Sequence, residues 1–256
     1  MPFVERDSAR LFYDAVGEGS AILFCHGAGG SGLSWLHQIP AFSNHHQCVV
    51  LDHRCFGRSS ANWSAFEPRQ FGADAVAVLD ALRIESAHLV CQSMGGWTGL
   101  QLARHHPSRV LSLTLCNTIA GVAYQPAIQH FSQWHEKAGA GGIADSALSE
   151  AYKNGNPAGT MLYRQIKAFN PPQDMSALSR LFAQDVLVPP SELGSIVPPV
   201  HFIASDDDPL FPAQFIREIA DQTPRSTFHS VIGAGHSAYF ERPEEFNAIL
   251  RQCIDE

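Results

Sequence analysis

The stretch Cys91-Gln92-Ser93-Met94-Gly95-Gly96 decides the fold. It ends an apolar run and leads into a helical pattern, so Ser93 stands at a turn from strand to helix. Such a turn is tight, and it requires small side chains two residues before and two residues after the serine. Gly95 meets this requirement, whereas Cys91 is larger than the usual glycine. The pattern favours a nucleophile elbow, with Ser93 as the nucleophile, over an ordinary helix-capping serine.

Apolar runs and helical patterns alternate on both sides of this turn. Six short runs, nearly continuous in apolar residues and bounded by turn signals, are typical of strands buried on both faces of a sheet. Helical patterns at residues 71–82 and 97–104 lie between consecutive runs. This alternation predicts an α/β fold with a mostly parallel central sheet flanked by helices. The six runs are residues 21–25, 48–51, 88–91, 110–116, 200–204 and 228–232.

The alternation breaks between residues 121 and 198. This stretch is rich in Ala, Gln, Gly and Pro, has helical patches at residues 128–138 and 161–169, and contains no convincing strand. We therefore predict that residues 1–120 and 199–256 form the core of the domain, and that residues 121–198 are a helical cap inserted between two strands. A chain of 256 residues is long enough for one such domain with one insertion.

Two further segments supply partners for Ser93. His236 follows the last apolar run in a glycine-rich loop, where an imidazole at the carboxyl edge of the sheet can reach the elbow. Asp208 follows the preceding run, and a carboxylate there can orient the histidine. Three acids are adjacent at this point, so Asp207 stays open as an alternative, although a proline four residues after Asp208 favours Asp208. We predict His236 as the general base and Asp208 as its acid.

A glycine-rich loop, Cys25-His26-Gly27-Ala28-Gly29-Gly30, follows the first apolar run. Glycines let the backbone turn close to the nucleophile, so a backbone N–H of this loop can donate to a developing oxyanion. The alternative is a phosphate-binding loop, but the Gly-Lys-Ser/Thr ending of such loops is missing here. The loop is therefore a candidate part of an oxyanion hole.

Along nearly its whole length the chain resembles the α/β-hydrolase superfamily, which includes serine esterases, enol-lactone hydrolases and meta-cleavage-product hydrolases. The order serine, acid, histidine is the one found in that superfamily. The resemblance implies the backbone amides of Ala28 and Met94 as oxyanion-hole donors, and a structural role for residues 52–59, where Cys55 replaces a common glycine. The matching elements are His26-Gly27-Ala28-Gly29, residues 52–59, the Ser93 elbow, residues 208–212, and Gly235-His236 leading to residues 241–246.

A seryl nucleophile with an oxyanion hole suits an acyl substrate. We expect a carboxylesterase- or lactonase-like serine hydrolase that cleaves a small-molecule carboxylic ester or lactone through an acyl-enzyme on Ser93. One alternative is carbon–carbon bond hydrolysis of the meta-cleavage-product type. Such enzymes commonly carry Asn before the nucleophile and Trp after the histidine, where this chain has Gln92 and Ser237. The other alternative is a non-catalytic ligand-binding protein on the same scaffold, and the complete set of serine, acid and histidine favours catalysis over it.

Composition limits the partners and cofactors. The net charge of −8 gives no reason to expect nucleic acid or an anionic membrane as a partner, and no run of about 18 apolar residues occurs. The six cysteines are scattered without a Cys-x-x-Cys pair, and no metal-ligand spacing is present. We expect a cytoplasmic enzyme without metal or cofactor, acting on a small molecule with an apolar or aromatic group. The sequence does not define the oligomeric state.

Overall fold

The computed structural model describes residues 2–137 and 146–255, which contain an eight-stranded sheet in the order β1-β2-β4-β3-β5-β6-β7-β8. β2 pairs antiparallel with both β1 and β4, and the other neighbouring strands are parallel. The strands are β1 (Phe3–Arg6), β2 (Ala9–Val16), β3 (Ser20–Cys25), β4 (His46–Leu51), β5 (Ala87–Gln92), β6 (Val110–Cys116), β7 (Val200–Ser205) and β8 (Ser226–Val231).

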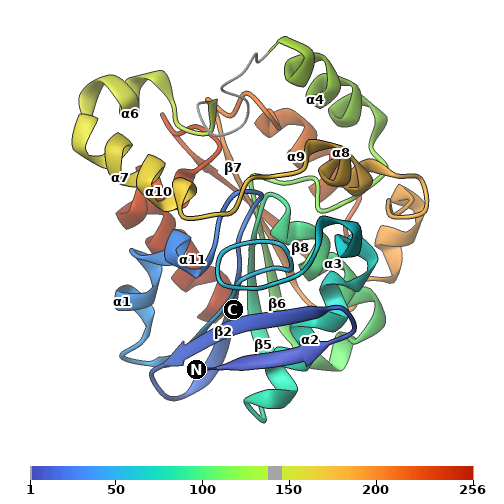
Figure 1. Cartoon of the computed structure of the whole chain (residues 1–256). Helices are drawn as coiled ribbons and strands as arrows, with labels where there is room; N and C mark the ends of the chain where they lie inside the picture. Colours follow the sequence, from blue (N-terminus) through green and yellow to red (C-terminus); the bar gives the residue numbers. More distant parts are fainter. Residues whose placement is uncertain (1, 138–145, 256) are drawn as a thin grey trace.

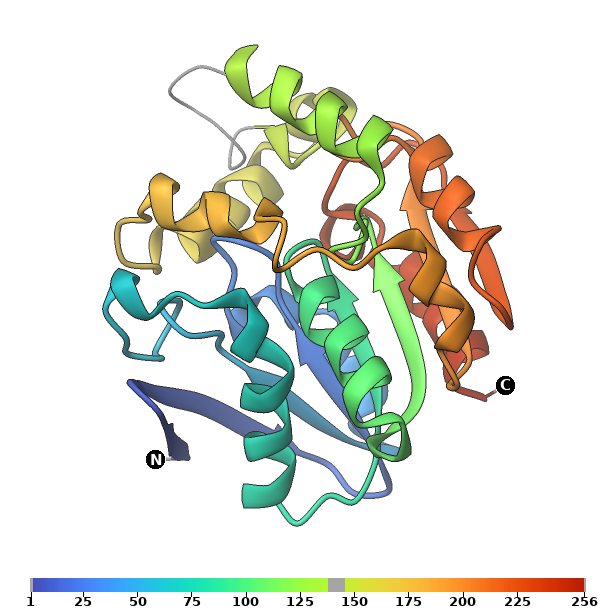
Figure 2. The same cartoon turned by 90° about the vertical axis from the view of Figure 1, so that its right-hand side faces the viewer.

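Helices cover both faces of the sheet, and a further group lies over the carboxyl ends of its strands (Figure 1, Figure 2). Within the described residues, no helix is both long enough and apolar enough to cross a membrane. The α-helices are α1 (Gln38–Phe42), α2 (Phe71–Ala81), α3 (Gly95–His105), α4 (Gln125–Lys137), α6 (Glu150–Gly155), α7 (Pro157–Ala168), α8 (Met175–Leu178), α9 (Ala213–Ala220), α10 (Ala238–Glu241) and α11 (Pro243–Asp255). The 3-10 helices are η1 (Gly32–Trp35), η2 (Trp63–Ala65), η3 (Pro68–Gln70), η4 (Pro107–Arg109), η6 (Ser179–Phe182) and η7 (Pro190–Ser195).

Each face of the sheet has its own apolar core. Alternate residues of a strand point to opposite faces, so Leu23, Leu89 and Leu113 pack under α2, α3 and α9. Their neighbours Ile22 and Val90 pack under α1 and α11 on the other face. The central strands are therefore apolar on both sides, and this is why they stand out in the sequence as continuous apolar runs.

The predicted fold, a mostly parallel sheet flanked by helices, is confirmed, and the six predicted runs are strands β3 to β8. The sequence pattern did not reveal β1 and β2. These two strands form the antiparallel edge of the sheet and are partly exposed to solvent. Their charged residues interrupt the apolar pattern, so they lack the continuous run that marks a strand buried on both faces.

The segment of residues 121–198 folds largely into helices. In its described parts, residues 121–137 and 146–198, it contains α4, α6, α7 and α8 with η6 and η7, and no strand. Residues 138–145 of this segment lie outside the described residues. Figure 2 shows α4, α7 and α8 over the carboxyl ends of the parallel strands. This edge is where ligands bind in open α/β sheets.

Candidate active site

Ser93 occupies the turn between β5 and α3. Its backbone has a φ of +50°, in the left-handed region that non-glycine residues rarely adopt. Three hydrogen bonds hold this turn: the N–H of Ser93 donates to the carbonyl of Cys116 at 3.0 Å, and the carbonyl of Ser93 accepts from the hydroxyl of Thr118 at 2.7 Å and from the N–H of Gly96 at 2.8 Å. Ser93 is half-buried, whereas Gln92 and Met94 on either side are buried. The sheet thus presents this one side chain at its carboxyl edge.

Small residues around the Ser93 turn leave room for its backbone to pass close to neighbouring strands. A Cβ on Gly95 would lie 2.2 Å from the carbonyl oxygen of Cys25, closer than a side chain can approach. Cys91, where glycine is usual, is accommodated by Gly99, because a Cβ on Gly99 would lie 2.7 Å from the Cys91 sulfur. Burial raises the pKa of the Cys91 thiol well above its ordinary value, so the thiol stays protonated and unreactive. The space left by Gly99 therefore accommodates Cys91 at the position where the usual motif has glycine.

His236 and Asp208 are hydrogen-bonded inside the protein. Nδ1 of His236 lies 2.8 Å from Oδ2 of Asp208, and the two residues are 2% and 3% exposed. The Asp208 carboxylate also accepts hydrogen bonds from the N–H groups of Leu210 (2.8 Å) and Phe211 (3.2 Å), and from the side-chain amide of Asn117 (3.0 Å). These donors stabilise an ionised carboxylate in a buried position.

The two neighbouring acids lie outside this arrangement. Asp206 and Asp207 are exposed. A carboxylate oxygen of Asp206 accepts a hydrogen bond from the N–H of Gly233 at 2.7 Å. Of the three acids, Asp208 is the one that is hydrogen-bonded to His236 in the part of the chain that the structure describes. The geometry therefore favours Asp208 over Asp207 as the partner of the histidine.

Two contacts bring His236 and the glycine-rich loop to the elbow. The side-chain amide of Gln92 donates to the carbonyl oxygen of His236 at 3.1 Å. A Cβ on Gly27 would lie 2.9 Å from the Cβ of Ser93, so the backbone of the loop touches the serine. Nε2 of His236 is buried and has no hydrogen-bond partner within residues 2–137 and 146–255. Because a buried polar atom needs a hydrogen-bond partner, Nε2 of His236 can accept a hydrogen bond from a hydroxyl group at the site.

The backbone amides of Ala28 and Met94 are the predicted oxyanion donors. Ala28 follows Gly27 on the loop, and Met94 follows Ser93 at the N-terminus of α3. Within the described residues neither N–H donates a hydrogen bond to another backbone group. The helix N-terminus adds a positive potential beside Met94. Both amides are thereby available to an oxyanion.

Two buried histidines brace the glycine-rich loop. Nδ1 of His26 lies 2.8 Å from the carbonyl oxygen of Gly27, and Nε2 of His26 accepts a hydrogen bond from the N–H of His53 at 3.0 Å. The second contact requires an unprotonated Nε2. Desolvation lowers the pKa of His26 to about 3 and holds the pKa of His53 well below its ordinary value. Both rings are therefore neutral at pH 7, and the hydrogen bonds of the His26 ring hold the loop.

We expect the free energy of unfolding to fall as the pH drops from 7 to 5. An unfolded chain protonates these histidines near pH 6.5, whereas folded His26 is protonated only near pH 3. Because the unfolded state then binds more protons, stability is present above pH 6.5 and is lost below it, by roughly 2 kcal/mol for His26 between pH 7 and pH 5 and further through His53. Urea titrations across this range measure the loss. His135→Gln removes an exposed histidine and should keep the wild-type dependence, and a constant stability from pH 7 to 5 would contradict the expectation.

The loop of residues 52–59, for which the resemblance implied a structural role, is held by its own polar contacts. The Asp52 carboxylate accepts hydrogen bonds from the N–H of Arg58 at 2.8 Å and from its guanidinium at 3.0 Å. Cys55 has a φ of +71°. Glycine adopts this conformation with less strain, which explains why glycine is common at this position.

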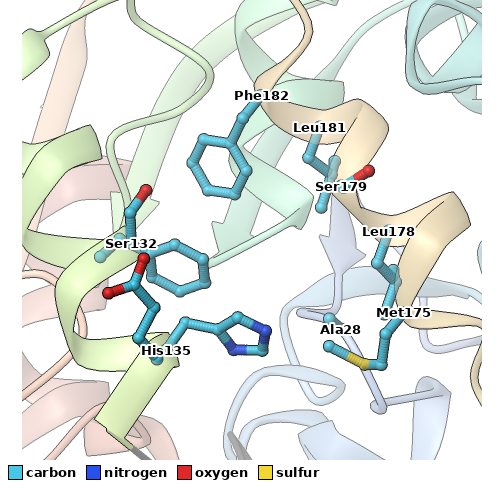
Figure 3. Close-up of a pocket in the computed structure, with 10 residues that line it drawn as sticks. Ala28, Ser132, His135, Met175, Leu178, Ser179, Leu181 and Phe182 are labelled. Atoms are coloured by element: carbon cyan, nitrogen blue, oxygen red, sulfur yellow. The ribbon is translucent and has the colours of Figure 1, made fainter.

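A cavity of about 290 Å³ adjoins Ala28, between α4 on one side and α8 with η6 on the other (Figure 3). Leu178 and Phe182 face it from one wall, and His135 faces it from α4 (Figure 3). Because Ala28 is also a predicted oxyanion donor, the cavity lies beside the candidate reaction centre. Its lining is mostly apolar and consists of Ala28, Phe131, Ser132, His135, Glu136, Met175, Leu178, Ser179, Leu181 and Phe182.

Comparison with known proteins decides the family. The model of the alpha/beta hydrolase family matches residues 22–249. The chain belongs to the alpha/beta hydrolase family. A protein of Caulobacter vibrioides named "Putative carbamate hydrolase RutD" is 30% identical over 258 residues, which cover 91% of this chain and 90% of that protein. A protein of the same name from Azorhizobium caulinodans is 37% identical over 117 residues, which cover 46% of this chain and 44% of that protein.

Among solved structures, "Est816 as an N-Acyl homoserine lactone degrading enzyme" is similar with a TM-score of 0.83 at 29% identity, covering 98% of this chain and 99% of that chain. The family and these relatives make the protein a hydrolase of the alpha/beta class. They do not identify its substrate.

Three polar residues at the site of this hydrolase were not predicted from the sequence. Asn117 follows β6 and donates to Asp208. Its position directly after a central strand is a signal that could have identified it, because polar residues at that edge meet the ligand. Lys167 and Asn170 belong to the segment of residues 121–198 and contact the glycine-rich loop. No periodicity in the sequence marks these two residues.

One group of potential metal ligands comes together elsewhere in the described residues. Ligand atoms of His201, His229 and Cys253 all lie within 4.8 Å of one another, and this donor set suits zinc. The hydroxyl of Thr227 contacts both imidazoles, at 2.9 and 3.2 Å. These residues belong to β7, β8 and α11, far apart in the sequence, so no spacing motif revealed them. They are not on the loops that carry Ser93 and His236.

Proposed function

We propose that this hydrolase cleaves a small-molecule carboxylic ester or lactone through an acyl-enzyme on Ser93. His236 is the general base, Asp208 orients it, and the amides of Ala28 and Met94 bind the oxyanion. The observation that carries the proposal is the buried hydrogen bond between His236 and Asp208, on a loop that is hydrogen-bonded to Gln92, the residue before Ser93. This arrangement is suited to transferring a proton from the serine hydroxyl.

In the acylation step, Oγ of Ser93 attacks the carbonyl carbon of the substrate while Nε2 of His236 takes the hydroxyl proton. The Asp208 carboxylate accepts the Nδ1–H and stabilises the imidazolium that forms. The carbonyl oxygen becomes an oxyanion and accepts hydrogen bonds from the two backbone amides. The bond to the alcohol oxygen then breaks, and the alcohol leaves with the proton from His236.

In the deacylation step, a water molecule takes the place of the alcohol. His236 removes a proton from the water as its oxygen attacks the acyl carbon, and the same amides bind the second oxyanion. When the bond to Oγ breaks, Ser93 recovers its proton from His236. The products are a carboxylic acid and an alcohol, or one hydroxy acid from a lactone.

A substrate panel tests this proposal. It contains short 4-nitrophenyl esters, small lactones, a carbamate ester and a vinylogous diketone. We expect turnover of an ester or a lactone. The carbamate is included because two relatives are named carbamate hydrolases, and its carbonyl can be attacked in the same way. Turnover of the diketone alone would favour carbon–carbon bond hydrolysis, and binding without turnover would favour a ligand-binding protein.

We infer that the segment of residues 121–198 is a cap that selects the substrate. Its helices α4 and α8, with η6, form the walls of the cavity beside Ala28. The volume, about 290 Å³, suits a small ligand. The apolar walls favour an apolar acyl or alcohol group, so the chemistry belongs to the core and the choice of substrate to the cap.

Phe131→Ala should shift the preference toward longer acyl chains. The Phe131 ring packs against Phe182, with centroids 4.9 Å apart, and against Phe211 at 5.4 Å, so its removal enlarges the cavity. The ratio of kcat/KM for 4-nitrophenyl octanoate to that for the acetate should rise by about 10-fold. Phe169→Ala removes an exposed ring just after α7 and should keep the ratio. Equal losses on all chain lengths in Phe131→Ala would mean that this ring only stabilises the fold.

A further inference from the structure

Helix α7 reaches two parts of the proposed site from the cap. The hydroxyl of Tyr163 lies 2.9 Å from the hydroxyl of Ser237, the residue after His236. The ammonium of Lys167 donates to the carbonyl oxygen of Ala28 at 3.3 Å. Residues four apart lie on the same side of a helix. The helix therefore spans from the loop of the general base to the loop of the oxyanion hole, and Lys167 stands at the second.

The Lys167 ammonium has no carboxylate partner in the part of the chain that the structure describes. Apart from the Ala28 carbonyl, the ring of Tyr163 lies near it, with its centroid 5.2 Å from Nζ. Desolvation lowers the pKa of Lys167 from 10.5 to about 8, so the ammonium is mainly charged at pH 7. Because Lys167 is half-buried, its ammonium loses part of its hydration, and no carboxylate within the described residues compensates for that loss.

A purely structural role does not require this charge. Asn170, just after α7, already connects the cap to the core. Its side-chain amide donates to the carbonyl of Gly29 at 2.7 Å, and its side-chain oxygen accepts a hydrogen bond from the N–H of Gly57 at 2.8 Å. One neutral hydrogen bond thus connects Asn170 to the glycine-rich loop, and a second connects it to the loop of residues 52–59. The additional positive charge of Lys167 suits the binding of an anion.

We propose that Lys167 binds a carboxylate of the substrate, so that the enzyme acts on small esters or lactones with one negative charge near the scissile carbonyl. This inference rests on the proposed function at Ser93. A single ammonium matches a single carboxylate, whereas a phosphate group is usually held by several donors together. Glu136 lines the α4 wall of the cavity and would repel a carboxylate there, whereas Lys167 contacts Ala28 at the glycine-rich loop.

Two esters of nearly equal size test the proposal. Mono-4-nitrophenyl glutarate carries a carboxylate, and 4-nitrophenyl valerate does not. We expect the wild type to prefer the glutarate at pH 7. Lys167→Met should lower kcat/KM for mono-4-nitrophenyl glutarate by about 10- to 100-fold, mainly by raising KM. The same variant should change kcat/KM for 4-nitrophenyl valerate less than about threefold. Lys167→Arg should keep part of the preference, and Arg164→Met, which removes an exposed charge from the same helix, should keep all of it.

Equal use of both esters by the wild type, or an equal loss on both in Lys167→Met, would overturn the proposal. Calorimetric titration with glutarate separates it from the proposed ester chemistry. Free glutarate should bind the wild type and Arg164→Met but not Lys167→Met. If glutarate binds in this way while neither ester is cleaved, the carboxylate site is supported and only the proposed ester chemistry is contradicted. Glutarate binding that survives in Lys167→Met would overturn the carboxylate site. Urea unfolding of Lys167→Met at or above the wild-type midpoint would show that the fold is intact.

Discussion

Ser93→Ala should lose nearly all turnover, with kcat falling by about 10⁴- to 10⁶-fold. The change removes the oxygen that forms the acyl-enzyme. The hydrogen bonds that hold the turn use the backbone N–H and carbonyl of Ser93 and not its hydroxyl. The variant should therefore fold as the wild type does. Initial rates on the best ester or lactone of the panel, with urea unfolding of the same preparations, measure both effects.

Ser93→Gly is the matched variant for this prediction. It also removes the nucleophile, but glycine adopts a φ of +50° without the strain that serine bears. We expect the same loss of turnover together with a gain in unfolding free energy of about 1 kcal/mol. A Ser93→Ala variant that kept more than about a tenth of the wild-type kcat would rule out Ser93 as the nucleophile, since that loss is far smaller than removal of a nucleophile causes.

Asp208→Asn should lower kcat by about 10⁴-fold with little change in KM. The Asp208 carboxylate lies 2.8 Å from Nδ1 of His236 and accepts its proton in a hydrogen bond. An amide that turns its NH₂ group toward Nδ1 favours the other tautomer, with the proton on Nε2, and that histidine cannot act as a base toward Ser93. Steady-state kinetics on the same substrate measure the change.

Asp207→Asn is the control for the acid, because Asp207 is exposed and adjacent in sequence. It should keep kcat within about twofold, as expected for a surface substitution. If Asp207→Asn lowered kcat by orders of magnitude and Asp208→Asn kept it within about twofold, the assignment of the acid would be wrong by one residue. The pair of variants thus separates the role of the buried carboxylate from the loss of one negative charge on the loop.

The central sheet was predictable because its strands are apolar on both faces. Strands β3 to β7 give nearly continuous apolar runs that need no knowledge of the partner strand, and the half-buried edge strand β8 gives a more mixed run. The edge strands β1 and β2 were not predictable in this way, because their exposed side chains carry charges. Their pairing is set by contact with β4, which local sequence does not encode.

The candidate site was predictable to the extent that it follows strand ends. Ser93 stands directly after the central strand β5, His236 follows the edge strand β8 by a short loop, and glycines mark both loops. The choice among three adjacent acids depends on the way the chain turns after β7. The N–H groups of Leu210 and Phe211 hold the Asp208 carboxylate inward. The place of Lys167 depends on how the segment of residues 121–198 packs on the rest of the protein, and a local sequence pattern does not encode such long-range packing.

The site of covalent modification decides whether Ser93 is the nucleophile. An alkyl fluorophosphonate reacts with an activated serine, and mass spectrometry of the digested protein locates the adduct. We predict one adduct, on the peptide that contains Ser93, formed as turnover of the ester or lactone is lost, and no adduct in Ser93→Ala. Loss of turnover with Ser93 unmodified and the adduct on another residue would contradict the proposed mechanism.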